Sequence, residues 1–199
     1  MCFRGGHLHV LQWLVSQGCS PKEKTTYLAA SHGHLSVVEW AYNDHQAYMD
    51  QNTIDAAARG GYLDIVKWYH DQGCPWDWRA CSGAAEGGHL KVLKWLRENG
   101  CPWNARTCAS AAKGGHLRIL KWCVKQGCPL SEFCCALAAQ SGNLRILKWL
   151  RKNGCPWDSL TTEAASRSKR ASNAACLKWA LDNGCPPCAR DGRRPARRR

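Results

Sequence analysis

The sequence predicts an all-α solenoid of stacked helix-turn-helix repeats, because three markers recur in one register. A tryptophan series has spacings of 27, 28, 27, 27, 27 and 30 residues: Trp13, Trp40, Trp68, Trp95, Trp122, Trp149, Trp179. A Gly-Cys pair follows it at Cys19, Cys74, Cys101, Cys128, Cys155 and Cys185. An Ala-Ala pair precedes it by eleven residues from Ala29–Ala30 to Ala138–Ala139. One hairpin cannot bury its own apolar faces, so such a period indicates copies stacked in a row.

Each repeat is expected to form two short helices. The first, around TCASAA at residues 107–112, consists of small residues that let neighbouring backbones approach closely. The second, LKVLKWLRE at residues 90–98, has an apolar arc of roughly 220° at about 100° per residue, wider than a surface helix needs. Gly114–Gly115 turns the chain between the helices, and Asn99–Gly100 followed by Pro102 ends the second helix.

The period divides the chain into a half repeat at residues 1–19, six repeats and a basic tail. The repeats cover residues 20–46, 47–74, 75–101, 102–128, 129–155 and 156–185, and residues 186–199 form a tail that we expect to be disordered. Met1 leads almost directly into a second helix, which indicates a fragment of a longer array or a truncated gene model. The last repeat contains the insertion SRSKR, as terminal repeats often depart from the consensus.

Charge and cysteine content indicate the compartment. The net charge is +13, and six arginines lie in the last ten residues, RDGRRPARRR. This tail is a nuclear-import signal, a nonspecific anchor for polyanions, or a solvated, disordered end. The sequence has no signal peptide and no apolar run of the roughly 18 residues that a membrane span needs. We therefore expect a cytoplasmic or nuclear protein, not secreted, that does not bind membranes and keeps its 14 cysteines as free thiols.

No residue pattern indicates catalysis. Equivalent cysteines in successive repeats are about 8–10 Å apart, too far for a disulfide, so they are interpreted as small core residues, as are Cys81, Cys108 and Cys135. The single CxxC, Cys185 to Cys188, lacks a second pair of zinc ligands. Repeated histidines are interpreted as structural, and there is no phosphate loop, nucleophile elbow or catalytic carboxylate pair. We predict no enzymatic activity, no catalytic residue, no metal and no cofactor.

A column of basic residues precedes the tryptophans: Lys67, Lys94, Lys121, Lys148 and Lys178. Basic residues interleaved with aromatic rings can bind nucleic acid through phosphate contacts and base stacking. The alternative interpretation is a solvated helix edge beside buried rings.

At this level of detail the repeat resembles the ankyrin repeat. Its second half, AAxxGHLxVVxxLLxxGA, aligns without a gap on AAKGGHLRILKWCVKQGC at residues 111–128 and almost as well on residues 84–101. The resemblance extends over residues 5–185, with two departures. The TPLH motif is absent at residues 106–109, and the period is 27 instead of about 33, so the projecting β-hairpin is shortened or missing.

The resemblance implies a non-enzymatic scaffold that binds a protein partner on the concave and loop face of the array. The positions that carry binding in the family correspond here to eight residues: Trp78, Arg79, Glu86, Arg106, Ser110, Lys113, Phe133 and Gln140. We expect a monomer and an unidentified protein partner. The alternative function is a basic, sequence-tolerant nucleic-acid binder that uses the lysine column and the arginine tail.

Overall fold

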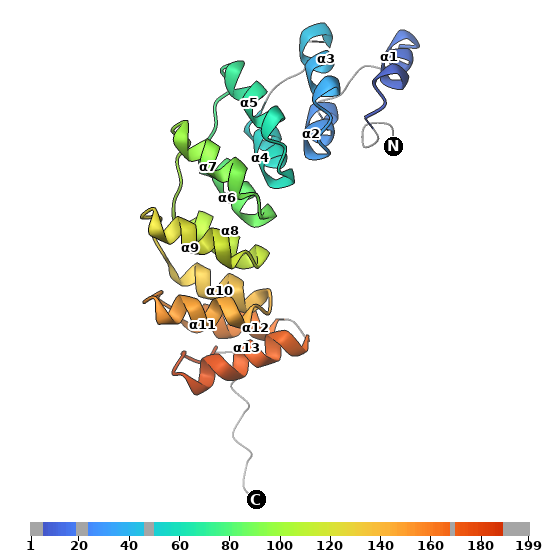
Figure 1. The fold of residues 1–199 in the computed structure, drawn as a ribbon. Helices are drawn as coiled ribbons and strands as arrows, with labels where there is room; N and C mark the ends of the chain where they lie inside the picture. The colour runs from blue at the N-terminus through green and yellow to red at the C-terminus, as the bar shows by residue number, and fades with distance from the viewer. Residues whose placement is uncertain (1–5, 19–23, 46–49, 168–169, 189–199) are drawn as a thin grey trace, which may run out of the picture. The chain divides into compact units, whose positions relative to one another are not determined.

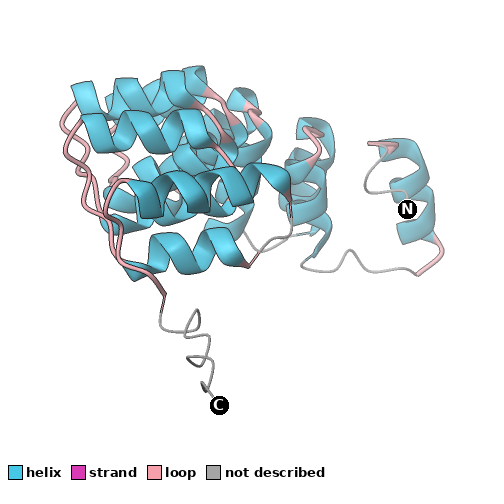
Figure 2. Ribbon diagram, turned by 90° about the horizontal axis from the view of Figure 1, so that it is seen from below, coloured by secondary structure: helices cyan, strands magenta, loops and turns pink. Residues whose placement is uncertain are grey.

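The computed structural model describes residues 6–18, 24–45, 50–167 and 170–188. All regular structure in these ranges is helical, without a strand (Figure 2). The chain divides into two compact units, unit 1 at Met1–Trp103 and unit 2 at Asn104–Arg199. Each unit consists of stacked helical hairpins, which confirms the predicted all-α class of helix-turn-helix repeats.

Unit 1 begins with α1 (Leu8–Ser16), a helix in the register of a second helix (Figure 1). Three hairpins follow: α2 (Lys24–Ser31) with α3 (Leu35–His45), α4 (Gln51–Gly60) with α5 (Leu63–Asp71), and α6 (Trp78–Gly87) with α7 (Leu90–Glu98). The first helices α2, α4 and α6 pack against one another in that order. They form the densest contacts between neighbouring repeats of this unit.

Unit 2 repeats the same plan with three hairpins. These are α8 (Ala105–Gly114) with α9 (Leu117–Lys125), α10 (Glu132–Gln140) with α11 (Leu144–Lys152), and α12 (Ser159–Ser166) with α13 (Ala171–Asp182). Helix α10 packs between α8 and α12. The predicted repeat boundaries stay a prediction, and the arginine tail lies outside the described residues from position 189 onward.

Small buried residues explain why the first helices pack so closely. Both alanines of the Ala-Ala pair are fully buried in α2, α4, α6, α8 and α10. The predicted core cysteines of α6, α8 and α10, Cys81, Cys108 and Cys135, are also fully buried. These short side chains keep adjacent helices in direct contact, so the interpretation of these cysteines as core residues is confirmed.

The Gly-Cys cysteine connects the end of a repeat to its beginning. The Sγ of Cys101, Cys128 and Cys155 each lies 3.3 Å from the carbonyl oxygen of the residue that caps its own repeat's first helix. The Sγ of Cys185 lies 3.2 Å from the carbonyl oxygen of Asp158 in the same way. Burial raises the pKa of the Cys185 thiol, which keeps it protonated as a donor. All twelve described cysteines are buried, and none of them forms a disulfide.

The last five tryptophans of the series lie at a similar depth on the second helices, whereas Trp13 is exposed and Trp40 is buried. Trp68, Trp95, Trp122, Trp149 and Trp179 are all half-buried. The Trp95 ring lies 5.5 Å from that of His70 in the preceding repeat and 5.9 Å from that of Trp76 at the start of its own repeat. The Trp95 indole therefore packs over the chain segment that joins α5 to α6.

Residues at the histidine position pack over the turn of the preceding repeat. The His89 ring lies against Gly61, whose φ of 85° is left-handed, and the Tyr62 ring lies against Gly33. In unit 2, Asn143 takes this position, and its Nδ2 donates to the Ala112 carbonyl oxygen at 3.5 Å. These contacts support the structural interpretation of the repeated histidines.

Candidate interaction surfaces

The exposed edge of the first helices carries the predicted partner-binding residues; we call this edge the first-helix face. In unit 1, Arg79 is exposed beside the half-buried Trp78, with 6.0 Å between the Arg79 guanidinium and the Trp78 ring centroid. The Arg79 Nε lies 3.5 Å from Asp77 Oδ2. Glu86 Oε2 lies 2.9 Å from Arg59 Nη1 on α4, so Glu86 takes part in an ion pair between repeats.

Unit 2 places the other five predicted residues on the packed helices α8 and α10. Arg106 and Lys113 are exposed, and Ser110 between them is half-buried. Seven residues make about two turns of helix, which places Arg106 and Lys113 on the same side of α8. Phe133 has an exposed fraction of 46%, and Gln140 is exposed. The predicted residues of each unit thus share one face, but nothing in the structure tests whether they bind a partner.

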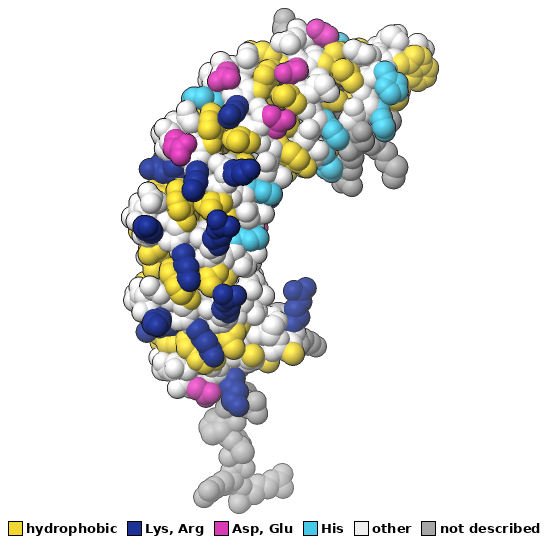
Figure 3. All heavy atoms as spheres, viewed as in Figure 1, with side chains coloured by type: hydrophobic (Ala, Val, Ile, Leu, Met, Phe, Trp, Pro, Cys, Tyr) yellow, Lys and Arg dark blue, Asp and Glu magenta, His cyan; other side chains and the backbone are white. Residues whose placement is uncertain are grey.

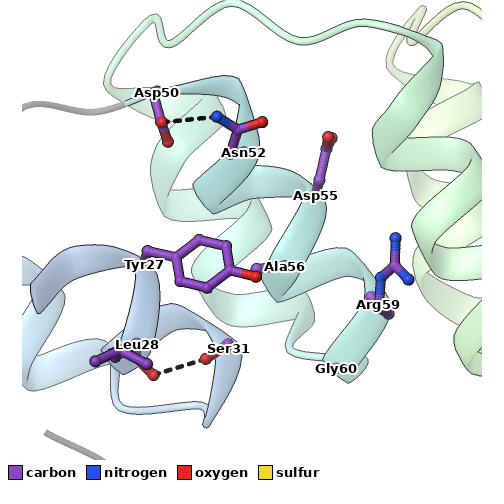
Figure 4. A pocket seen from close by; sticks show the side chains of 9 residues that line it. All are labelled: Tyr27, Leu28, Ser31, Asp50, Asn52, Asp55, Ala56, Arg59 and Gly60. Atoms are coloured by element: carbon purple, nitrogen blue, oxygen red, sulfur yellow. Dashed lines mark hydrogen bonds between the residues drawn. The ribbon is translucent and has the colours of Figure 1, made fainter. Parts of the chain in front are cut away.

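A hollow of about 910 Å³ lies on the first-helix face of unit 1, between α2 and α4 (Figure 4). Its polar lining includes Tyr27, Ser31, Asn52, Asp55 and Arg59. Sequence reasoning missed these residues, although the signal was present: shifting Arg79 and Glu86 back by one 27-residue period gives Asn52 and Arg59. Applying the register to that repeat would have found these two residues, but not Tyr27 or Asp55.

Asp55 has the most unusual electrostatic environment of this hollow. Burial raises its pKa to about 7, and the carboxylate of Asp77 adds to the shift. The cations Arg79 and Arg59 oppose the shift without cancelling it. Near neutral pH, the hollow therefore contains a carboxyl group that gains or loses a proton readily.

The second helices of unit 2 form a different surface, defined by charge. Residues 1–103 contain nine lysines and arginines against ten acidic residues, whereas residues 104–199 contain nineteen against five. Every exposed residue of α9 and α11 is a cation, and we call these six the basic patch: Arg118, Lys121, Lys125, Arg145, Lys148 and Lys152. Figure 3 shows lysine and arginine side chains gathered over these helices. The predicted lysine column is exposed throughout.

Features of other site classes are few in the described part of the chain. It contains no group of three or more histidine, cysteine, aspartate or glutamate side chains that could hold a metal ion. Cys185 and Cys188 are both buried and free. Among the described helices, none combines the length and apolar character required to cross a bilayer.

Comparison with known families agrees with the geometry. Residues 78–122 match the family model of ankyrin repeats (many copies), which confirms the ankyrin resemblance in that stretch. No curated protein matches the chain.

Among solved structures, the chain is similar to the pentatricopeptide repeat protein PPR10 from maize, with a TM-score of 0.45 and 17% identity over 94% of this chain and 34% of that chain. It is also similar to PPR10 in complex with an 18-nt psaJ RNA element, with a TM-score of 0.41 and 17% identity over 88% of this chain and 33% of that chain. The chain thus spans about a third of the length of these structures. The likeness is one of helical-repeat architecture, and no ligand is inferred from it.

Proposed function

We propose that this chain, which contains ankyrin repeats at residues 78–122, is a non-enzymatic scaffold that binds a protein partner on its first-helix face. Repeat proteins bind through equivalent positions of successive units, which together make an extended surface. The contrast between buried and exposed positions of the first helices supports the proposal. Buried positions hold alanine and cysteine in repeat after repeat, whereas the exposed positions differ in charge and size.

Two exposed positions show this contrast most clearly. The second position of α4, α6, α8 and α10 holds Asn52, Arg79, Arg106 and Phe133. The ninth position of the same helices holds Arg59, Glu86, Lys113 and Gln140. Core packing does not require this variety, because these side chains lie at the surface or its margin. A particular partner would make use of it.

The hollow of unit 1 adds a concave, polar element to the same face. Ligand sites are concave and combine apolar walls with a few placed polar groups. Here the exposed ring of Tyr27 stands beside Asp55 and Arg59 in the lining. We propose that one part of the partner enters this hollow while other parts lie along the exposed residues.

Affinity capture from an extract of the native cells tests this function. The immobilised chain is compared with the double variant Arg106→Glu and Lys113→Glu, which reverses two charges on the first-helix face of α8. The control variant, Lys91→Glu and Lys94→Glu, reverses two exposed charges on the second helix α7. Bound proteins are identified, and their affinity is measured with purified components at low and high salt.

We expect one protein to bind the wild-type chain and the control with equal affinity at both salt concentrations. Its affinity for the α8 variant should fall at least tenfold, as is expected when charges at the centre of an interface are reversed. If every captured protein binds the α8 variant as tightly as the wild type, the first-helix face is not the binding surface.

We propose a basic, sequence-tolerant nucleic-acid-binding activity as the second candidate function. It is favoured by the exposed lysine column and the basic patch, because clustered cations are the electrostatic signature of such proteins. The arginine tail would add to this activity. A monomeric state and a cytoplasmic or nuclear location stay predictions of the sequence.

A further inference from the structure

We infer that the basic patch on α9 and α11 is the nucleic-acid site of the chain, and that it binds backbone phosphates without stacking bases. The inference rests on the second candidate function and assigns it to six residues of unit 2. It differs from the sequence prediction, which placed binding on the lysine column and the arginine tail.

The patch is defined by position within the helix. In both α9 and α11, the second, fifth and ninth residues are exposed, and all six are lysine or arginine. Positions two and nine are about 10 Å apart at 1.5 Å of rise per residue. Helices α9 and α11 are the second helices of neighbouring repeats, so the six cations form two rows, each about 10 Å long. Two such rows can face several phosphates of one nucleic-acid molecule at once.

Helix α5 of unit 1 has a different charge pattern at the same three positions. The same three exposed positions hold Asp64, Lys67 and Asp71 in α5 of unit 1. Helix α5 has buried apolar residues at the same positions as α9 and α11. The exposed charges therefore vary while the buried positions stay apolar. Position five alone, the lysine column, does not separate the two units. Positions two and nine make the exposed side of α9 and α11 uniformly basic.

The six cations are available to a ligand. None of them forms an ion pair with a carboxylate in the described residues. The remaining cation of α11, Arg151, is engaged with the loop that follows, because its guanidinium lies 4.1 Å from the Trp157 ring centroid. Lys148 Nζ lies 5.9 Å from the Trp179 ring centroid, so that lysine is supported by a ring and remains exposed.

The indoles beneath the patch are unsuited to base stacking. Trp122 and Trp149 are half-buried, in contrast to the protruding rings on which bases stack. Phosphate contacts require only accessible cations, which the patch supplies. The structure therefore favours sequence-independent binding to the nucleic-acid backbone.

Composition also argues against an anionic membrane as the ligand. Surfaces that lie in a membrane interface carry apolar residues beside their cations. The exposed positions of α9 and α11 include no apolar residue. A surface made of cations alone can contact phosphates but has no apolar residue to insert into a bilayer.

The charge pattern of α5 supplies the test. The patch variant changes Arg118, Lys125, Arg145 and Lys152 to aspartate, which gives α9 and α11 the Asp-Lys-Asp pattern of α5. The control changes Lys91, Arg167, Arg170 and Asn43 to aspartate and Gln72 to glutamate, and it has the same net charge as the patch variant. A third variant replaces the six tail arginines with glutamine. All are made in the full chain, and circular dichroism verifies their helix content.

Binding is measured by fluorescence anisotropy with a labelled 20-nucleotide oligo-dT strand and a labelled 20-base-pair duplex. Six contacts predict a slope of log Kobs against log salt of about −5 on the duplex and about −4 on the single strand. The patch variant should lose affinity at least a hundredfold at about 0.1 M salt, with a slope on the duplex no steeper than about −2. The control and tail variants should keep most of the affinity and a slope close to that of the wild type.

The outcomes separate the inference from the function on which it rests. If the wild-type chain binds neither probe, the second candidate function fails and the inference fails with it. If the wild type binds but the patch variant binds equally well, the function stands and the location on α9 and α11 is wrong. Equal binding of poly-glutamate, or of phosphatidylserine vesicles, would show that the patch does not select nucleic acid and would overturn the assignment.

Discussion

The loops after α5, α7 and α11 are each held by a pair of side chains, one on the helix and one in the loop. In residues 129–155, the Arg151 guanidinium lies 4.1 Å from the Trp157 ring centroid and donates to the carbonyl oxygen of Cys155. One repeat earlier, Val124 and Leu130 stand at the equivalent positions. A cation thus accompanies a tryptophan, and an apolar residue accompanies a leucine.

The first unit follows the same rule. The Arg97 guanidinium lies 4.4 Å from the Trp103 ring centroid and donates to the Cys101 carbonyl oxygen. In the repeat before it, the His70 ring stacks on Trp76 at 4.3 Å with an interplanar angle of 2°. We therefore predict that the two positions are energetically coupled.

The perturbation is Arg151→Val, Trp157→Leu and the double variant, which reproduces the pair of the preceding repeat. A partly buried cation–π contact contributes about 1 kcal/mol, within a range of roughly 0.5–2. Arg151→Val also removes a charged hydrogen bond that is worth roughly 1.5–3 kcal/mol when fully buried, less at this half-buried position. We expect each single variant to lower the free energy of unfolding by about 2 kcal/mol and the double variant by about 3.

Urea unfolding followed by far-ultraviolet circular dichroism measures the free energy of unfolding of the wild type, the two single variants and the double variant. The control cycle pairs Trp157→Leu with Arg145→Val, an exposed arginine of the same helix, and should be additive. A coupling below about 0.3 kcal/mol in the Arg151 cycle lies within the additivity of independent sites and would refute the reasoning.

Two further predictions concern unit 1. Gly61→Ala should destabilise the chain more than Gly73→Ala, because both glycines have positive φ values, 85° and 73°, but only Gly61 faces the His89 ring. The left-handed conformation costs about 1–2 kcal/mol in both variants, so equal urea midpoints would contradict a role for the ring. Asp55 has a pKa raised by burial to about 7, so its proton stabilises the folded state at low pH, and this contribution is lost as the pH rises through 7. We expect Asp55→Asn to be more stable than the wild type at pH 8 and to lack that decline, while an unchanged pH profile of thermal unfolding would contradict the assignment.

The repeat fold could be predicted from the sequence because its markers report buried positions. Alanine pairs, cysteines such as Cys108 and the half-buried tryptophans are fixed by contacts that every repeat makes in the same way. A position with the same neighbours in each copy must hold the same kind of residue. Periodicity therefore carries the information about packing directly.

Details that depend on two different positions could not be predicted in the same way. The role of the Gly-Cys cysteine requires knowing that its thiol reaches the capping residue of the same repeat, 24 positions earlier for Cys101 and Asp77. The hollow beside Tyr27 depends on side chains from α2 and α4 together. Neither the thiol contact nor the hollow produces a repeated residue type in the sequence. Periodicity therefore could not predict their geometry.

The independence of buried and exposed positions explains how repeats with different surface charges can share one fold. Backbone contacts of the repeat are made by buried alanines, by capping residues such as Asn104 and by thiols such as that of Cys128, none of which depends on the exposed positions. A second helix can therefore present Asp64 in one repeat and Arg145 in another at little cost, since exposed substitutions usually change stability by less than about 0.5 kcal/mol. The charge difference between the two units can therefore be used for binding. For the same reason, we expect the variant that gives α9 and α11 the charge pattern of α5 to keep the fold.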